Sequence, residues 1–227
     1  MVNKSLTVII PIYNEKDIIK KALFELNLFM KQNFNDYELL IIESGSTDGS
    51  WELLDNLAAK NNKIKLIHEG KRNGFGSAIK LGYQNASKDY VTMTTVDGPF
   101  DIGVVVEAAQ LMNKYDCVLS YRSEDPRGLF RKFQSLVYNL IVKTALGLKF
   151  KHVNSAFKMF KKNDIDKMKL TSNTWFIDAE ILYWVKKLNL KYYELPVKVI
   201  DRKDGKSSVG MFSFIDILKE LIKFKKI

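Results

Sequence analysis

The sequence has few of the residues that build disulfide frameworks and metal clusters. Its 227 residues include one cysteine, Cys117, so a disulfide-stapled fold and a cysteine-rich zinc module are excluded. Two histidines, His68 and His152, are too few for a histidine-based metal cluster. Four prolines and twelve glycines without a repeating period exclude collagen-like and low-complexity chains.

Long hydrophobic runs are also scarce. The longest apolar candidate, residues 136–148, is interrupted by Asn139 and Lys143 and is shorter than the roughly 20 residues of a membrane-spanning helix. The chain begins with a strand-like run and shows no basic segment followed by a cleavage site, which argues against a secretory signal. We therefore expect a cytoplasmic protein, and peripheral attachment to the cytoplasmic face of a membrane stays open.

What the sequence has in excess is positive charge. It carries 36 Lys and Arg against 26 Asp and Glu, a net charge of +10, in an otherwise globular composition with 46% hydrophobic residues. A basic protein suits phosphate-rich partners such as nucleotides, nucleic acid or anionic lipids. No recognition-helix or base-stacking motif is present, and the acids Glu43 and Asp97 would repel a nucleic-acid backbone, so we expect no nucleic-acid partner.

The order of apolar segments predicts an α/β fold. Strand-like runs alternate with helical patterns, which is typical of a mostly parallel central sheet with helices on both faces. We expect strands at 6–11, 37–43, 63–68, 90–95, 117–121, 153–160 and 192–199. No linker divides the chain, so residues 1–211 are predicted to form a single domain, followed by a C-terminal amphipathic helix at 212–227.

Polar residues at helix starts suggest capping roles. Asn14 is expected to cap the first helix, and Ser46 or Thr47 the second. Asp101 is expected to cap a helix that begins near Ile102.

Polar or glycine-rich segments follow the first four strands. Ligands of open α/β sheets bind beyond the carboxyl ends of the strands, so these segments are expected to converge on one cleft. They are Pro-Ile-Tyr-Asn-Glu at 11–15, Glu-Ser-Gly-Ser-Thr-Asp-Gly at 43–49, Arg-Asn-Gly-Phe-Gly at 72–76, and Thr-Val-Asp-Gly-Pro at 95–99.

Together these segments resemble the inverting glycosyltransferases of family 2, which have a GT-A (Rossmann-like) fold. The second half is most similar to dolichyl-phosphate mannose synthase and related polyprenyl-phosphate glycosyltransferases. Its supporting stretches are Asn-Ser-Ala-Phe-Lys at 154–158, Glu-Leu-Pro-Val at 194–197 and Gly-Lys-Ser at 205–207. The resemblance covers about residues 6–208, and it depends on the order of the pieces because each is weak alone.

The resemblance implies a nucleoside-diphosphate sugar as donor. Pro11 would shape the first turn, Tyr13 and Glu15 would pack on and bond the nucleotide, and Glu43 would accept a hydrogen bond from the base. Gly74 and Gly76 would let the backbone approach a ligand. The resemblance further assigns Val96, Asp97, Arg122, Arg202 and Lys206 to the donor site. For Arg72 we favour a solvated side chain over one that reaches the donor.

The metal motif departs from the family. The usual Asp-x-Asp is Thr95-Val96-Asp97 here, and Pro99 stands where a glutamine often assists. The resemblance implies Mg²⁺ or Mn²⁺ as cofactor, held by Asp97 at a weaker site than usual, with donor phosphates and water completing the shell. Asp101 is an alternative ligand, although helix capping is the favoured interpretation.

Cations in the second half would neutralise phosphates. By resemblance Arg131 and Ser135 would bind an acceptor phosphate, and Asp97, Arg131 and Arg202 would support catalysis. A phosphate acceptor needs no general base, whereas a glycan hydroxyl would need one, for which Asp178 and Glu180 are candidates. We favour a structural role for Asp178 and leave Glu180 open.

Two further alternatives stay open. The altered motif at Thr95 also fits a catalytically silent nucleotide-sugar-binding partner subunit. The apolar and basic helices at 129–148 and 212–227 fit either binding to an anionic membrane surface or covering of the core. The sugar, the base and the oligomeric state are not readable from the sequence, and His68 and His152 are expected to be ordinary structural residues.

Overall fold

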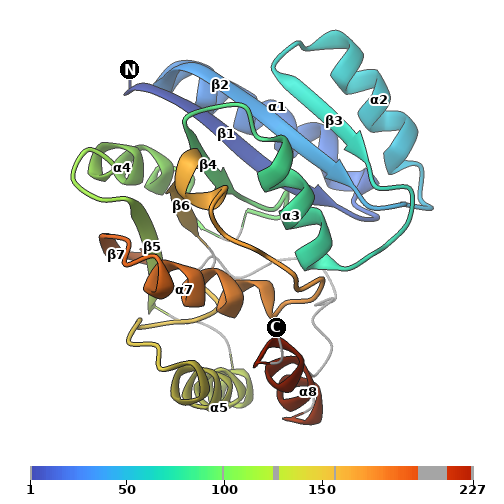
Figure 1. Cartoon of the computed structure of the whole chain (residues 1–227). Helices are drawn as coiled ribbons and strands as arrows, with labels where there is room; N and C mark the ends of the chain where they lie inside the picture. Colours follow the sequence, from blue (N-terminus) through green and yellow to red (C-terminus); the bar gives the residue numbers. More distant parts are fainter. Residues whose placement is uncertain (1, 99, 125–127, 156, 199–213, 226–227) are drawn as a thin grey trace.

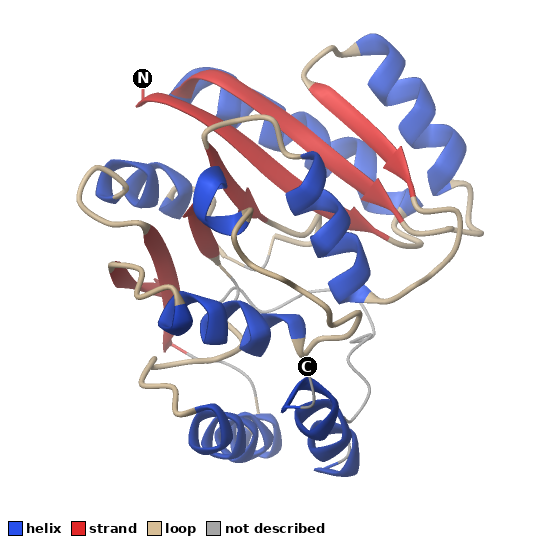
Figure 2. Ribbon diagram, viewed as in Figure 1, coloured by secondary structure: helices blue, strands red, loops and turns tan. Residues whose placement is uncertain are grey.

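The structure is a computed structural model that describes residues 2–98, 100–124, 128–155, 157–198 and 214–225. The predicted α/β class is confirmed: a central sheet is flanked by helices (Figures 1 and 2). The described strands are β1 (Val2–Ile12), β2 (Phe34–Glu43), β3 (Ile64–His68), β4 (Tyr90–Met93), β5 (Cys117–Glu124), β6 (Lys158–Lys161) and β7 (Tyr192–Lys198). The described helices are α1 (Lys16–Asn33), α2 (Ser50–Lys60), α3 (Phe75–Asn85), α4 (Val104–Leu111), α5 (Leu129–Leu146), α6 (Lys162–Ile165), α7 (Ile177–Lys187) and α8 (Phe214–Lys225).

The described sheet has the order β3-β2-β1-β4-β6-β5-β7. All neighbours run parallel except β6, which is antiparallel to both β4 and β5. The strand predicted at 153–160 corresponds to β6, which is shorter and begins later in the chain, at Lys158. Ahead of β6, the Val153 amide donates to Asn139 Oδ1 and the Phe157 amide to Ser120 Oγ, so these two amides have side-chain acceptors in place of a neighbouring strand.

Alternation along the buried strands sends side chains into two cores. In β1, Ile9 packs with buried residues of α3 and α7, and Val8 and Ile10 pack with those of α1 and α4. The core on the first face also receives Val142 of α5 and Leu221 of α8. Because both faces are covered by helices, the strands are apolar on both sides, as expected for a parallel sheet.

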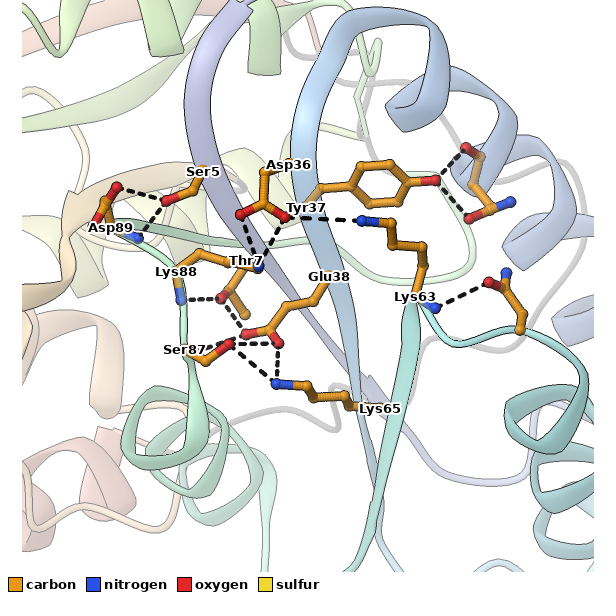
Figure 3. A network of polar contacts seen from close by, with 12 residues as sticks. Ser5, Thr7, Asp36, Tyr37, Glu38, Lys63, Lys65, Ser87, Lys88 and Asp89 are labelled. Carbon is orange, nitrogen blue, oxygen red and sulfur yellow. Dashed lines mark hydrogen bonds and ion pairs between the residues drawn. The ribbon is translucent and has the colours of Figure 1, made fainter.

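A polar network ties the α3–β4 connection to the first three strands (Figure 3). At its centre the buried Glu38 accepts hydrogen bonds from Thr7, Ser87 and Lys65. Burial alone would raise the pKa of Glu38, but the bonds from Lys65, Thr7 and Ser87 outweigh it and lower the pKa to about 2. Beside it, Lys88 pairs with Asp36 at 2.7 Å.

Candidate active site

Three strand ends lie in register at one edge of the sheet. Ile12 of β1 pairs with Glu43 of β2, and Glu43 pairs with His68 of β3. The arrowheads of these strands end side by side in Figure 1. The loops that follow, residues 13–15, 44–49 and 69–74, are therefore neighbours. The end of β4 joins them, because the Thr94 amide bonds Ile9 O of β1 at 3.0 Å.

The loops after β1 and β2 are fastened to each other. Asn14 has a left-handed backbone, with φ of 56°. Its amide donates to Ser46 Oγ at 3.0 Å, and its Oδ1 accepts from the Thr47 amide at 2.8 Å. Asn14, Ser46 and Thr47 therefore join two loops, and the predicted capping roles of these residues are wrong.

Asp48 accepts hydrogen bonds from backbone amides at the N-termini of both α1 and α2. Its carboxylate accepts from the Lys16 amide of α1 at 3.0 Å and from the Ser50 amide of α2 at 2.9 Å. One anion at two helix N-termini is stabilised by both sets of unpaired amides. Burial opposes its ionisation, but hydrogen bonds from Ser50 and Lys16 lower the pKa of Asp48 below its ordinary value.

Tyr13 and Arg72 meet across the loops. The Arg72 guanidinium carbon lies 4.2 Å from the centre of the Tyr13 ring, a cation–π contact between the loops after β1 and β3. Arg72 is exposed and Tyr13 half-buried, so the pair lies at the surface of this edge. Pro11 and Glu15 are also half-buried there. The predicted solvated Arg72 thus has an aromatic partner.

Glu43 is fully buried at the end of β2, and both of its oxygens are engaged. Oε1 accepts from the Ser46 amide at 2.6 Å, and Oε2 lies 3.2 Å from His68 Nδ1. Burial would raise the pKa of Glu43, but the bonds from Ser46 and His68 outweigh it and lower the pKa. Its predicted contact with a nucleotide base stays a prediction.

His68 links Glu43 to α2. Its Nε2 lies 3.0 Å from Asp55 Oδ1, and its ring stacks on Trp51 at 3.7 Å. Carboxylates only accept, so bonding both requires a hydrogen on each ring nitrogen, which is the imidazolium form. Burial would lower the pKa of His68, but Asp55 and Glu43 together raise it above its ordinary value.

Gly74 and Gly76 make room for another part of the chain. A Cβ on Gly74 would stand 2.3 Å from Asn173 O, and one on Gly76 would stand 2.6 Å from Ser172 O. The Gly76 amide also donates to Asn173 O at 3.0 Å. The close approach that we expected of a ligand is made here by the backbone of residues 172–174. A donor contact by Gly76 remains a prediction.

The altered metal motif is held together by a hydrogen bond. The Thr95 hydroxyl donates to the Asp97 carboxylate, which is half-buried, as is Val96. Asp101 accepts from the Gly103 amide at 2.9 Å in the turn before α4. The helix begins at Val104 with Gly103 as its N-cap, so the predicted cap of a helix that begins near Ile102 is wrong. Within the described residues no three His, Cys, Asp or Glu side chains gather as a metal site. Asp97 is thus the acid that this motif offers.

The acids of the second half are bound to neighbours. Glu180 is fully buried and accepts from the Thr171 amide and hydroxyl and from the Ser172 amide at 2.7–2.8 Å. Asp178 pairs with the buried Lys158 at 2.7 Å. Both carboxylates therefore have structural partners, which favours a structural contribution for Asp178 and for Glu180.

Of the cations predicted to bind phosphates, the structure describes the side chain of Arg122 but not those of Arg131, Arg202 and Lys206. Arg122 of β5 donates from its guanidinium to Asn154 O at 2.8 Å, so it joins the family-like segment 154–158. Ser135 lies in α5, where its carbonyl accepts from Asn139 Nδ2. Arg131 belongs to the same helix, but its side chain is outside the described part. Arg202 and Lys206 also lie outside the described residues.

Sequence reasoning missed the contribution of two residues to this edge. Glu69 accepts from Ser44 Oγ at 2.8 Å and from Ser77 Oγ at 2.5 Å, so it ties the β2 loop to α3. His68, expected to be an ordinary structural residue, joins β2 to α2 beside the same loops. A usable signal existed, since His68 ends the third strand and Glu69 follows it, just before the glycine-rich turn.

Comparison with known proteins decides the family. The model of the family described as "Glycosyl transferase family 2" matches residues 7–169. The chain belongs to glycosyl transferase family 2. The predicted resemblance to this family is thereby confirmed, and curated relatives of the chain include polyprenyl-phosphate glycosyltransferases, the branch that the second half of the sequence resembles. The undecaprenyl-phosphate 4-deoxy-4-formamido-L-arabinose transferase of Aeromonas hydrophila is 28% identical over 96% of the chain and 67% of that protein. A dolichyl-phosphate beta-glucosyltransferase of Trichomonas vaginalis is 23% identical over 96% of the chain and 71% of that protein.

Solved structures confirm the predicted fold of this family 2 chain. Glucosyl-3-phosphoglycerate synthase of Mycobacterium tuberculosis, in complex with uridine diphosphate, matches with a TM-score of 0.71 and 16% identity over 99% of the chain and 81% of its own. A mannosyltransferase of Pyrobaculum calidifontis, in complex with GDP-Man and Mn²⁺, matches with a TM-score of 0.63 and 17% identity over 90% of the chain and 59% of its own. The chain thus spans about three fifths to four fifths of these proteins.

Proposed function

We propose that the chain binds a nucleoside-diphosphate sugar at the edge formed by β1, β2 and β3 and transfers the sugar to a polyprenyl phosphate with inversion. The observation that carries the proposal is the register of Ile12, Glu43 and His68, which gathers the family's donor loops at one place. The Tyr13–Arg72 pair adds an aromatic face and a cation there. Polyprenyl phosphates appear in the names of the curated relatives.

A divalent cation fits the chemistry of Asp97. The site offers one carboxylate, steadied by the Thr95 hydroxyl, and Mg²⁺ or Mn²⁺ takes further oxygens from phosphates and water. Asp97 would hold the ion, which would neutralise the donor diphosphate. The Mn²⁺ bound with GDP-Man in the Pyrobaculum mannosyltransferase supports a divalent cation for a chain of this fold. With one acid, we expect weaker metal affinity than an Asp-x-Asp motif provides.

The choice of acceptor depends on whether the chain offers a free carboxylate as general base. An acceptor phosphate oxygen attacks the anomeric carbon, the carbon–oxygen bond to the donor diphosphate breaks, and the nucleoside diphosphate leaves with that electron pair. This attack needs no proton removal, whereas attack by a hydroxyl does. Glu180 and Asp178 are both occupied by structural partners, which favours the phosphate acceptor over a glycan hydroxyl. Arg131 and Arg202 remain the proposed phosphate-binding cations.

A lipid acceptor requires access to a membrane surface. Along α5, four exposed apolar side chains recur at spacings of four, three and four, and so share one face of the helix. They are Leu129, Phe133, Leu136 and Leu140, each 64–85% exposed. The basic residue Lys132 is exposed beside them. In the described part of the chain, none of the helices has the length and apolar content needed to cross a bilayer. We propose that α5 lies on the cytoplasmic face of an anionic membrane.

The test is sugar transfer by the full chain. UDP- and GDP-sugars are incubated with undecaprenyl or dolichyl phosphate and with Mg²⁺ or Mn²⁺, and the lipid-linked sugar is measured. We expect product with one donor, and loss of about 100-fold or more in Asp97→Asn, as for removal of one transition-state charge contact. Glu107→Gln, which changes an exposed acid on α4, is the matched control. Donor binding without any turnover would instead establish the silent binding subunit.

A further inference from the structure

The segment 171–175, here called the strap, lies between the donor-site turn and the C-terminal helix. On one side its backbone fills the space above Gly74 and Gly76, and Asn173 O accepts from the Gly76 amide. Trp175 of the strap stacks on Phe75 at 4.0 Å, with the rings 15° from parallel. The turn at residues 72–76 is thus shaped by the strap.

Two more contacts hold the strap to the helices behind it. Lys80 of α3 donates to Thr171 O at 2.9 Å and to Asn173 Oδ1 at 2.6 Å. Glu180 of α7 binds the amides of Thr171 and Ser172 from within the core. Lys80 and Glu180 both lie on regular helices, so the strap is held on two sides by rigid elements.

The third support comes from α8. Glu220 Oε2 accepts from Thr174 Oγ1 at 3.1 Å and from Ser172 Oγ at 3.4 Å. The same helix buries Leu221 in the core and places Phe224 against Phe176, with ring centres 5.6 Å apart. Lys219, Ile222 and Lys223 of α8 are exposed, with Ile222 at 56%. In Figure 1, α8 and α5 lie side by side, and the two helices are in contact.

We propose that α8 positions the donor-site turn through the strap, and that Glu220 is the positioning residue that anchors the strap to α8. The inference deepens the proposed function and rests on it, because the turn at 72–76 carries Arg72, the partner of Tyr13. Seating of α8 then sets the geometry in which the donor is bound. The helix that helps set the donor site is also the neighbour of the helix proposed to touch the membrane.

The first experiment measures the turn directly and needs no nucleotide. Hydrogen exchange is followed in the full chain for peptides that cover residues 72–78 and 171–176. Glu220→Ala removes the acceptor, and we expect about three- to tenfold faster exchange in both peptides, the effect of one lost hydrogen bond. Glu220→Gln keeps an acceptor oxygen and should restore the wild-type rates. Glu107→Ala, which changes an exposed acid on α4, is the matched control. Unchanged exchange at 72–78 in Glu220→Ala would overturn the inference.

The second experiment connects positioning to function. Affinity for UDP and for GDP, each with Mn²⁺, is measured by calorimetry, and donor KM and kcat are measured where turnover is found. We expect Glu220→Ala to weaken nucleotide binding about three- to tenfold and to act through KM, with Glu220→Gln near wild type. Thr174→Val removes the same bond and also the acceptor of the Phe176 amide, so its effect should be at least as large, and the two changes together should be less than additive.

The outcomes separate the two proposals. Wild-type protein that binds neither nucleotide contradicts the proposed function, whereas the exchange data still decide the contribution of Glu220. Wild-type binding with equal affinity in Glu220→Ala contradicts the inference alone. Equal loss in Glu220→Ala and Glu220→Gln would show that charge, and not anchoring of the strap, is what matters, and it would also overturn the inference.

Discussion

Glu38 provides a prediction with a worked magnitude. Its side chain is 2% exposed, and hydrogen bonds of 2.6–2.8 Å from Thr7, Ser87 and Lys65 surround the carboxylate. The pKa of about 2 lies below the ordinary value of 4.5. Because the folded pKa is the lower one, ionised Glu38 stabilises the fold above pH 4.5, and the stabilisation is lost as the pH falls toward 2. At 1.36 kcal/mol per pH unit, the gap corresponds to about 3 kcal/mol at pH 7.

The perturbation is Glu38→Gln, and the assay is urea unfolding at pH 7 and at pH 3. The amide has no charge to pair with Lys65 and offers one acceptor oxygen in place of two, so we expect the variant to lose about 3 kcal/mol at pH 7. By linkage about 2 kcal/mol of the wild-type advantage should have disappeared by pH 3. Glu25→Gln, at a glutamate that is 63% exposed, should change the free energy of unfolding by about 0.5 kcal/mol or less. An equal difference between wild type and Glu38→Gln at both pH values would refute the reasoning.

Three further predictions concern the site and the membrane face. Gly76→Ala should destabilise the protein by about 2 kcal/mol or more in thermal unfolding, since the new Cβ would stand 2.6 Å from backbone oxygens. Gly128→Ala is the control, because open space surrounds that position, and it should leave thermal unfolding unchanged. Because the folded pKa of His68 is raised, the protonated ring stabilises the fold below pH 6.5, and this stabilisation is lost as the pH rises through the folded pKa. The free energy of unfolding of His68→Gln should therefore differ from that of wild type more at pH 6 than at pH 9. A larger difference at pH 9 would contradict this. Leu136→Ser should weaken binding to anionic vesicles about fivefold at unchanged stability, while Phe24→Ser, 69% exposed on α1, should leave binding unchanged.

Much of the fold could be predicted because its signals are local. Apolar runs such as residues 6–11 are long enough to mark buried parallel strands, and the helical spacing between them marks the crossovers. The antiparallel β6 was harder to place. Its amides before Lys158 are bonded by Asn139 and Ser120, two residues that are distant in sequence, and no local pattern reports such partners.

The candidate site was predictable in its location but less so in its contacts. Strand ends could be located from the sequence, and a family pattern assigned residues to them. The partners of Asn14 and Gly76 come from loops 32 and about 97 positions away, so capping and ligand approach were plausible expectations that tertiary contacts replaced. His68 has the same explanation, since its two carboxylate partners lie on β2 and α2.

Polar contacts tie the chain together toward both ends of the strands, but the proposed donor loops follow the carboxyl ends alone. Toward the amino ends of the strands, ion pairs of Glu38 with Lys65 and of Asp36 with Lys88 hold the strands and the α3–β4 connection together (Figure 3). At the carboxyl ends, the loops are joined by amide and hydroxyl bonds around Asn14 and Asp48, which fix the loop backbone while leaving Arg72 exposed. A preorganised rim of this kind lowers the cost of ordering when a charged donor binds. Variants of the buried Glu38 should therefore change the free energy of unfolding, whereas variants of the exposed Arg72 should change donor affinity first.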